Sequence, residues 1–426
     1  MTREYAVPAA ARGSVLGQAE IDAVAALVRS GAPLSAGRSR TEFEERFAEH
    51  LGAAHALTVT SGTVALRLAV DLLDLREGDE VIATPQTYQA TVQPLLEHPV
   101  RVRFCDVDPD SLALDAGALE ALLTDRTRAI MLVHYGGYPA DLARILELAR
   151  ARGAVVVEDC AHALGATRDG RHPGSLGDIG CFSFQGSKNI TTLGEGGMVT
   201  VHRSDWAERI ERTRGNDIDG EFVHTTPGAD VPAALPWMKY AEHIHRREVA
   251  ALRRGGTNAT MSEASAAVGL VQLAKLDTLV ERRRSIAARL DAALAAFAGR
   301  VRVPAVPHGV RHSYHLYTFF VEDPGARDRL LAALDRRGVE IQLRYYPQHL
   351  LPEWRARGHR RGECPVAERL WFDQHVNLPC HPGLTDEQVD HLVGALVGGL
   401  REVPHGPGAP SGATRATGGA TCPIST

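Results

Sequence analysis

One lysine stands out by its residue type. The chain contains 47 lysines and arginines, and only three of them are lysines: Lys188, Lys239 and Lys275. Arginine stays protonated and cannot act as a nucleophile, whereas a lysine amine can once burial or neighbouring charge lowers its pKa. Lys188 follows an apolar run at 179–184, typical of a buried strand, and precedes a glycine-rich segment. This setting favours a Schiff-base lysine over a surface lysine retained by chance.

An acidic pair lies at the end of another apolar run. Glu158 and Asp159 follow three valines, and His162 comes soon after them. Ligands of parallel α/β sheets bind at the carboxyl ends of the strands. A buried carboxylate needs a cationic or hydrogen-donating partner, or its pKa rises. A protonated pyridine nitrogen would be such a partner, with a net contribution of about 1.5–3 kcal/mol. The alternative is an aspartate that only caps the next turn.

Small polar residues follow the first predicted strand. Ser61, Gly62 and Thr63 stand where this strand ends and a helix begins. Backbone amides at a helix N-terminus attract anions, glycine lets a phosphate approach, and the hydroxyls add donors. A plain helix cap explains the same residues equally well. Tyr88, after the second strand, either lies flat on an aromatic ring or is an ordinary core or surface residue.

Together these residues describe one binding site. A phosphate cradle, an aromatic platform and hydroxyls accompany a carboxylate, Asp159, that stands 29 residues before Lys188. Pyridoxal 5'-phosphate (PLP) requires such a set: a Schiff-base lysine, a pyridinium partner, a stacking face and a phosphate anchor. No GxGxxG follows the first strand, and no HExxH or EF-hand pattern occurs. We therefore expect neither a dinucleotide nor a metal.

Composition excludes several classes of protein. The net charge of −5 argues against a general nucleic-acid binder, because phosphate binding needs a basic face. No apolar run approaches the roughly 20 residues that span a bilayer, and residues 1–13 lack the apolar core of a secretory signal. The six cysteines show no CxxC spacing and are typical of reduced thiols in a cytoplasmic protein.

The hydrophobic pattern predicts an α/β fold. Alternating strands and helices, with strands that are continuous apolar runs, imply a mostly parallel sheet covered on both faces. Strands are expected at 56–60, 80–83, 101–105, 129–134, 154–158, 179–184, 198–201, 314–321 and 340–344. Helices are expected at 18–30, 40–51, 64–75, 88–97, 140–152, 262–294 (with one possible break), 326–337 and 386–400.

These elements suggest four parts. They are a loose N-terminal arm (1–15), a large domain (16–250), a smaller α+β C-terminal domain (251–402) and a disordered tail (403–426) rich in Gly, Pro, Ala, Ser and Thr. The irregular segment 216–244 is long for a loop inside a compact domain, so we expect it to be functional or to form an interface.

The chain resembles the DegT/DnrJ/EryC1/StrS family, the sugar aminotransferases among fold-type-I PLP enzymes. The resemblance runs from about residue 14 to 400. It rests on Thr60-Ser61-Gly62-Thr63, Glu158-Asp159-Cys160-Ala161-His162-Ala163, the segment 177–184, Lys188-Asn189-Ile190-Thr191-Thr192 with Gly194-Glu195-Gly196-Gly197, and Asn377-Leu378-Pro379 with His381-Pro382.

The resemblance implies a role for each candidate residue. Lys188 would form the Schiff base and later move the proton between substrate and cofactor, and Asp159 would pair with the pyridine nitrogen. His162 would lie beside the ring hydroxyl, where the family often has glutamine. The remaining cofactor-binding residues would be Ser61, Gly62, Thr63 and Ser183 at the phosphate and Tyr88 on the ring.

The resemblance also implies a homodimer with shared active sites. Asn258 matches an asparagine that reaches the phosphate of the partner subunit in the family. Two departures bear on this contact and on the acceptor pocket. Thr260 precedes Met261 where the family often has arginine, and the residues at 185–187 differ from the commonest form.

Two stretches, residues 158–162 and the Phe184-Gln185 pair, resemble the sequences of the cyclitol branch of the family more than those of the nucleotide-sugar branch. This predicts transfer of an amino group from L-glutamine or L-glutamate to a keto-cyclitol of the scyllo-inosose type, in aminoglycoside antibiotic biosynthesis. Three alternatives remain: a nucleotide-linked ketosugar as acceptor, a dehydratase or aromatase of the aminohydroxybenzoate synthase type, and a non-catalytic protein on this fold.

Overall fold

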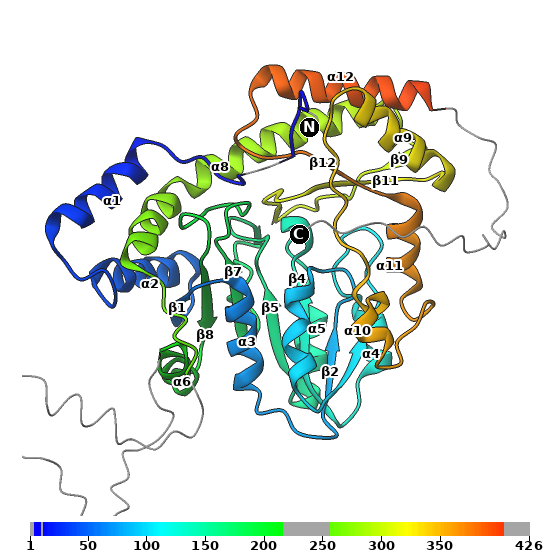
Figure 1. The fold of residues 1–426 in the computed structure, drawn as a ribbon. Coiled ribbons are helices and arrows are strands. Elements are labelled where there is room, and N and C mark those ends of the chain that lie inside the picture. Colours follow the sequence, from blue (N-terminus) through cyan, green and yellow to red (C-terminus); the bar gives the residue numbers. More distant parts are fainter. Residues whose placement is uncertain (1–3, 10–11, 216–255, 404–426) are drawn as a thin grey trace, which may run out of the picture.

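The computed structural model describes residues 4–9, 12–215 and 256–403. A seven-stranded sheet in the order β1-β8-β7-β5-β4-β2-β3 forms its centre (Figure 1). The strands are β1 (His55–Val59), β2 (Glu80–Ala83), β3 (Arg101–Phe104), β4 (Thr127–Val133), β5 (Val155–Asp159), β7 (Ile179–Ser183) and β8 (Gly197–Val201). In this sheet β8 runs antiparallel to β1 and β7, and the other pairs are parallel. The predicted mostly parallel sheet is confirmed.

Both faces of this sheet are buried. In β4, Ala129, Met131 and Val133 pack into one core, while Ile130 and Leu132 pack into the other. Successive side chains of a strand point to opposite faces, so a strand buried on both faces must be apolar throughout. The helices that cover the faces are α3 (Gly62–Leu72) and α6 (Ser204–Arg214) on the first, and α4 (Ala116–Leu122) and α5 (Ala143–Arg152) on the second.

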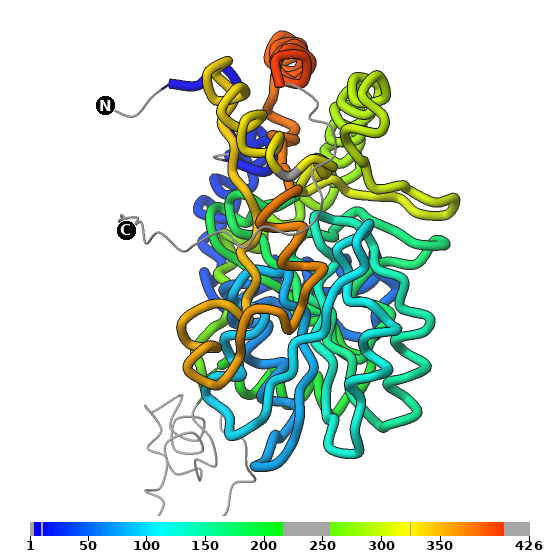
Figure 2. The backbone as a smooth tube through the Cα atoms, turned by 90° about the vertical axis from the view of Figure 1, so that its right-hand side faces the viewer, coloured from blue at the N-terminus to red at the C-terminus, as the bar shows by residue number. Residues whose placement is uncertain are grey.

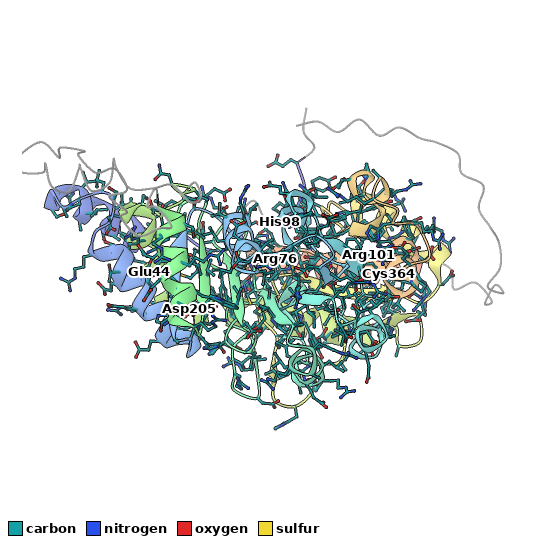
Figure 3. All side chains as sticks on the ribbon, turned by 90° about the horizontal axis from the view of Figure 1, so that it is seen from below. Glu44, Arg76, His98, Arg101, Asp205 and Cys364 are labelled. Atoms are coloured by element: carbon teal, nitrogen blue, oxygen red, sulfur yellow. The ribbon has the colours of Figure 1, made fainter. Side chains whose placement is uncertain are left out.

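A smaller antiparallel sheet lies above the first one. Its order is β12-β11-β9, formed by β9 (Val301–Arg302), β11 (Tyr317–Val321) and β12 (His375–Leu378). Figures 1 and 2 both place α9 (Pro324–Arg336) and α12 (Asp386–Glu402) at this end of the molecule. Figure 3 views the opposite end, where Arg101 opens β3.

One long helix contributes to both regions. Helix α8 (Glu263–Ala295) has 33 residues and continues without the break that the sequence pattern allowed. Leu276 and Val280 belong to a core beside the large sheet, whereas Ile286 and Leu290 belong to the core of the small sheet. Other elements are α1 (Gln18–Ser30), α2 (Arg38–Leu51), β6 (Thr167–Arg168), β10 (Val310–Arg311), α10 (Pro352–Arg355) and α11 (Pro365–Arg369).

Two local predictions are wrong. Instead of one helix at 88–97 there are two short 3₁₀ turns, Gln89–Thr91 and Gln93–Glu97, and Pro94 opens the second. Proline lacks an amide proton and clashes with the preceding turn, so an α-helix cannot continue through it. The expected strand at 340–344 is irregular. Its Glu340 amide donates to the Val7 carbonyl of the arm, and its Arg344 amide donates to the Asn377 side chain.

The N-terminal arm is fixed wherever the structure describes it, which corrects the prediction of a loose arm. Val7 is fully buried, donates to the Gly338 carbonyl and accepts from the Glu340 amide, at 3.0 Å each. Further along, the Gly13 amide donates to the Gly186 carbonyl at 2.9 Å, and a Cβ on Gly13 would come within 1.8 Å of the Ser187 carbonyl oxygen. The arm therefore packs against both the small-sheet region and the loop that carries Lys188.

Three expectations fall on the remaining residues. The predicted domain boundary at 250–251, the segment 216–244 and all of the tail beyond residue 403 lie outside the described residues. The described residues contain no helix that is long and apolar enough to cross a membrane.

Candidate active site

A cavity of about 470 Å³ opens where the parallel strands end. Its lining includes the last residues of β4, β5 and β7, which are Val133, Asp159 and Ser183, and the first turn of α3. Arg344 and Tyr345, from the segment between α9 and α10, complete it. The cavity lining brings together eight of the nine predicted site residues: Ser61, Gly62, Thr63, Tyr88, Asp159, His162, Ser183 and Lys188. The ninth, Asn258, does not line it.

Lys188 lies on the loop that leaves β7, in a turn closed by its amide and the Gln185 carbonyl at 2.8 Å. Burial lowers the pKa of its amine to about 8; the positive charge of Arg344 adds to this, while Asp159 and Glu195 oppose it. In the described part of the chain, Lys188 makes no ion pair. About a tenth of this amine is therefore unprotonated at pH 7, far more than for an ordinary lysine, and this neutral form is able to act as a nucleophile.

Asp159 is buried, with 4% of its surface exposed. One carboxylate oxygen accepts from the Thr91 hydroxyl at 2.6 Å and the other from the Ala161 amide at 3.0 Å. Burial raises the pKa of Asp159 although the Thr91 hydrogen bond opposes this. Asp159 has no cation in direct contact among the described residues, so a cationic ring nitrogen in the cavity would stabilise its charged form.

The first turn of α3 meets the end of β7. Ser61 caps the helix, and its hydroxyl oxygen accepts from the Val64 amide at 3.2 Å, so the plain helix cap is realised at this residue. A Cβ on Gly62 would come 2.7 Å from the Ser183 Cβ, so only glycine permits this approach. Thr63 is exposed. A helix start with adjacent hydroxyls is a ready anion site.

His162 forms an aromatic wall of the cavity. Its ring stacks on His315 (centroids 4.2 Å apart) and lies parallel to Tyr345 at 5.8 Å, and its Nε2 is 3.1 Å from the Tyr345 hydroxyl. Burial lowers the pKa of His162 well below its usual range, so the ring is neutral. Its Nδ1 is buried without a hydrogen-bond partner among the described residues. Tyr88, half exposed, packs against Tyr345 at 5.7 Å.

Asn258 is exposed and has a positive φ of 47°. Its amide donates to the Gly215 carbonyl at 3.2 Å. Its expected contact with a partner's phosphate stays a prediction.

One group of potential metal ligands occurs in the described part of the chain, namely His134, Glu158 and Cys160, with ligand atoms within 4.8 Å of one another. Both Glu158 oxygens already accept hydrogen bonds, from the His134 ring at 2.8 Å and from the amides of Gly174, Leu176 and Gly177. The group therefore has a structural explanation as a buried, satisfied network. The expected absence of a metal stays a prediction.

Sequence reasoning missed three residues of the site. The sequence gives only a weak signal for Thr91, namely that two threonines, Thr87 and Thr91, stand four residues apart beside Tyr88. In the structure their hydroxyls lie 2.6 Å apart. The sequence gave no signal for Arg344 and Tyr345, since only the packing of the segment between α9 and α10 onto the large sheet brings them to the cavity.

The donor set fits PLP. The cavity offers an amine whose pKa is lowered to about 8 and a helix N-terminus. Among the described residues it also offers a carboxylate without a contacting cation and a histidine nitrogen without a hydrogen-bond partner. These residues, at the carboxyl ends of a mostly parallel sheet, define a fold-type-I PLP enzyme.

Comparisons with known proteins identify the kind of enzyme. The pattern of the DegT/DnrJ/EryC1/StrS aminotransferase family matches residues 15–397, and the chain belongs to this family. GDP-perosamine synthase of Caulobacter vibrioides is 35% identical over 365 residues, which cover 85% of this chain and 90% of that protein.

Solved structures agree. The aminotransferase TlmJ from Streptoalloteichus hindustanus superposes with a TM-score of 0.80 at 32% identity, covering 93% of this chain and 99% of that one. The sugar aminotransferase Spr1654 from Streptococcus pneumoniae in its PLP form has a TM-score of 0.78 at 26% identity and covers 94% and 100%. The chain is a PLP-dependent aminotransferase.

Proposed function

We propose that this enzyme transfers the amino group of L-glutamate or L-glutamine to the ketone carbon of a ketosugar or keto-cyclitol. The observation that carries the proposal is the Lys188 amine, whose pKa is lowered to about 8, in one cavity with the buried Asp159. An amine of this pKa both attacks a carbonyl and moves protons near neutral pH.

The chain's own residues supply positioning and proton transfer. PLP, when bound, supplies an electron sink. We propose that Asp159 holds the ring nitrogen protonated and that Lys188 carries the proton between donor carbon and cofactor. The first turn of α3, with Ser61, Gly62, Thr63 and Ser183, would hold the phosphate. His162 would contact the ring through its free nitrogen, and Tyr88 would cover the ring.

Two observations bear on the acceptor. The similarity to GDP-perosamine synthase supports a nucleotide-linked ketosugar, which we place first. His162 and Gln185, on which the expectation of a keto-cyclitol rests, both line the cavity. The keto-cyclitol of aminoglycoside antibiotic biosynthesis is therefore the second candidate.

We also propose a homodimer in which Asn258 reaches the partner's cofactor phosphate. Its exposed side chain outside the cavity supports this proposal. Helix α1 exposes Ile21 and Val28 at 61% and 67%, and Leu193, two residues before the cavity residue Glu195, is 50% exposed, so apolar surface remains for a second subunit.

Three further predictions stand as proposals. They are a large domain at 16–250, a small domain at 251–402, and action in the cytoplasm. The five cysteines in the described part are free and buried, which supports a reducing compartment.

An absorption spectrum before and after L-glutamine or L-glutamate tests the function. We expect a lysine-dependent cofactor band that the donor converts to the aminated form with release of a 2-oxo acid, and no such band in Lys188→Ala. Turnover is then measured with a panel of nucleotide-linked ketosugars and keto-cyclitols. A stable band that no amino donor changes would contradict the transaminase and favour the dehydratase.

A further inference from the structure

We propose that the free edge of β3 binds an extended, acidic segment of a partner protein, which adds a strand to the large sheet. A second cavity, of about 670 Å³, follows this edge, and six consecutive residues, 99–104, line it. Among the described residues, it shares none of its lining with the candidate active site. Figure 3 views this end of the molecule, with Arg101 labelled.

The main chain of β3 is paired on one side. In the described part of the chain, β2 is its only neighbour in the sheet. The amides of Arg101 and Cys105 donate to main-chain carbonyls on or next to β2, at 2.9 and 3.0 Å. Alternate residues of a paired strand direct their main-chain groups to opposite sides, so Val102 and Phe104, which line the cavity, direct theirs away from β2. Such an edge is a template for another extended chain.

The side chains along this edge alternate between two chemistries. Val102 and Phe104 are buried in the core on one face of the sheet. Arg101 and Arg103 therefore point to the other face, where Nη1 of Arg103 donates to the Leu122 carbonyl at the end of α4 at 2.6 Å. Side chains directly opposite each other on paired strands interact. A segment that pairs with β3 should therefore alternate as well, with acidic side chains on the arginine face and apolar ones on the other.

Positive charge is in excess on the arginine face. Arg101 and Arg103 lie 3.7 and 3.6 Å from one buried carboxylate, Glu80. The same carboxylate accepts from the Arg126 guanidinium at 3.0 Å and from the Thr124 hydroxyl at 2.7 Å. Three arginines thus share one acid. The Arg101 side chain is 69% exposed, so its charge is accessible to a carboxylate of a docked segment.

The opposite wall of the cavity adds to this excess. Arg357 donates there to the Leu96 carbonyl at 2.9 Å, a neutral partner. Glu363 is the one acid of the described lining, beside three arginines, and it already contacts Nδ1 of His359 at 2.9 Å and the Arg360 amide at 3.2 Å. The lining is therefore complementary in charge to acidic side chains.

Charge also argues against other occupants of this edge. A second copy would place the arginines of β3 against each other, which is unfavourable. Residues 404–426 of this chain contain no Asp or Glu. Arginines on an edge strand also deter unwanted strand pairing, but deterrence does not require a hollow lined by apolar side chains such as Leu95 and Trp354. An acidic segment with alternating apolar residues matches both the charge and the hollow.

The test uses two fluorescently labelled hexapeptides and the PLP-loaded enzyme at low salt. One peptide alternates glutamate and valine, and the other has the same composition in two blocks, glutamates first. Anisotropy gives the affinities for the wild type and Arg101→Gln. The matched control is Arg329→Gln on α9, where the side chain is 53% exposed and lies 3.9 Å from Asp323. Hydrogen exchange of residues 99–105, with and without the alternating peptide, locates the binding.

We expect the block peptide to bind at least about tenfold more weakly than the alternating one, because only the alternating peptide presents acidic and apolar side chains to the correct faces. Arg101→Gln should weaken binding of the alternating peptide by about three- to tenfold, the effect of one exposed charge at low salt. Arg329→Gln should match the wild type. The bound alternating peptide should slow exchange of the amides at 102 and 104 by at least about threefold.

Four results would overturn the proposal. Failure of the alternating peptide to bind the wild type would show that the edge takes no such segment. Equal affinities of the two peptides would show attraction by charge alone. Binding that persists in Arg101→Gln, without a change of exchange at 99–105, would place the peptide elsewhere on the molecule. Slow exchange at 102 and 104 in the free enzyme that is lost on dilution would show that a second copy occupies the edge.

Discussion

Two lysines of this chain lie in opposite settings. Lys275 on α8 donates to the Glu20 carboxylate of α1 at 2.6 Å and is partly exposed. Lys188 has no ion pair in the described part of the chain, and burial lowers its pKa to about 8. The first works as a cation and the second as an amine, while Lys239 lies outside the described residues.

The difference shows what the scarcity of lysine means. Nearly all basic residues of this chain are arginines, so the scarcity of lysine alone would single out Lys188 and Lys275 equally as candidate reactive residues. Glu20 accepts from Lys275 and Gln272 and from the Gly17 amide; although burial alone would raise its pKa, these contacts lower it to about 2. The structural lysine, Lys275, therefore has a carboxylate in direct contact, and the reactive lysine, Lys188, has none among the described residues.

The largest effect is expected from replacing each lysine by arginine. Lys188→Arg keeps the charge but removes the transferable proton, so turnover should fall by at least about 10³-fold. Lys275→Arg keeps a cation beside Glu20 and should retain near wild-type turnover. Steady-state rates with matched cofactor loading make the test, and equal losses in the two variants would break the comparison.

Removing the acid of the cavity should have the next largest effect. Asp159→Asn keeps the shape but removes the charge, so turnover and cofactor affinity should fall by about 10- to 100-fold. Asp205→Asn is the control, because that side chain on α6 is 62% exposed. Cofactor retention after dialysis, measured by absorbance, checks this. Full retention in Asp159→Asn would argue against a ring-nitrogen contact.

On the Lys275 side, the expected loss is in stability. Glu20→Gln should lower the free energy of unfolding at pH 7 by about 1–3 kcal/mol. The folded pKa of Glu20, about 2, lies below its unfolded value, so its contribution is complete above about pH 5 and is lost as the pH falls towards 2. Denaturant unfolding at several pH values should show a difference that shrinks on acidification. A constant difference would contradict the assignment.

The smallest effect is a shift in pH dependence. The rate at which PLP-free enzyme recombines with PLP should rise with pH and reach half its maximum near about 8, because only the neutral Lys188 amine attacks the aldehyde. Arg344→Gln should move this midpoint up and Asp159→Asn should move it down, because they remove opposite charges. A midpoint near about 10.4, the value of a free lysine, would mean that the amine is not buried as described.

The fold was predictable to the extent that burial follows local pattern. Strands buried on both faces, such as β4, give continuous apolar runs that can be read directly. The pattern of α1 predicted the helix with its observed bounds but not its burial, because Ile21, which recurs at helical spacing with Val24 and Leu27, is 61% exposed. The pattern shows that a face is apolar but does not show what covers it.

The candidate site was predictable where its residues end consecutive strands of the large sheet, because parallel strands bring their carboxyl ends to one edge. Asp159 ends β5, and Lys188 lies on the loop that directly follows β7. Arg344 is different, since its place depends on long-range hydrogen bonds from Asn377, Tyr135 and Gln86 to its segment. The local sequence pattern does not predict such long-range contacts.

The seating of the N-terminal arm has a consequence for synthesis on the ribosome. Gly13 rests on Gly186, but Val7 is held by Gly338 and Glu340, more than 300 residues later in the chain. Val7 is thus made more than 300 residues before its partners, and such distant contacts form slowly. A nascent chain that has emerged only through α8 has the Lys188 loop but lacks the partner segment of Val7, so Val7 stays without these contacts until residues 338–340 are made.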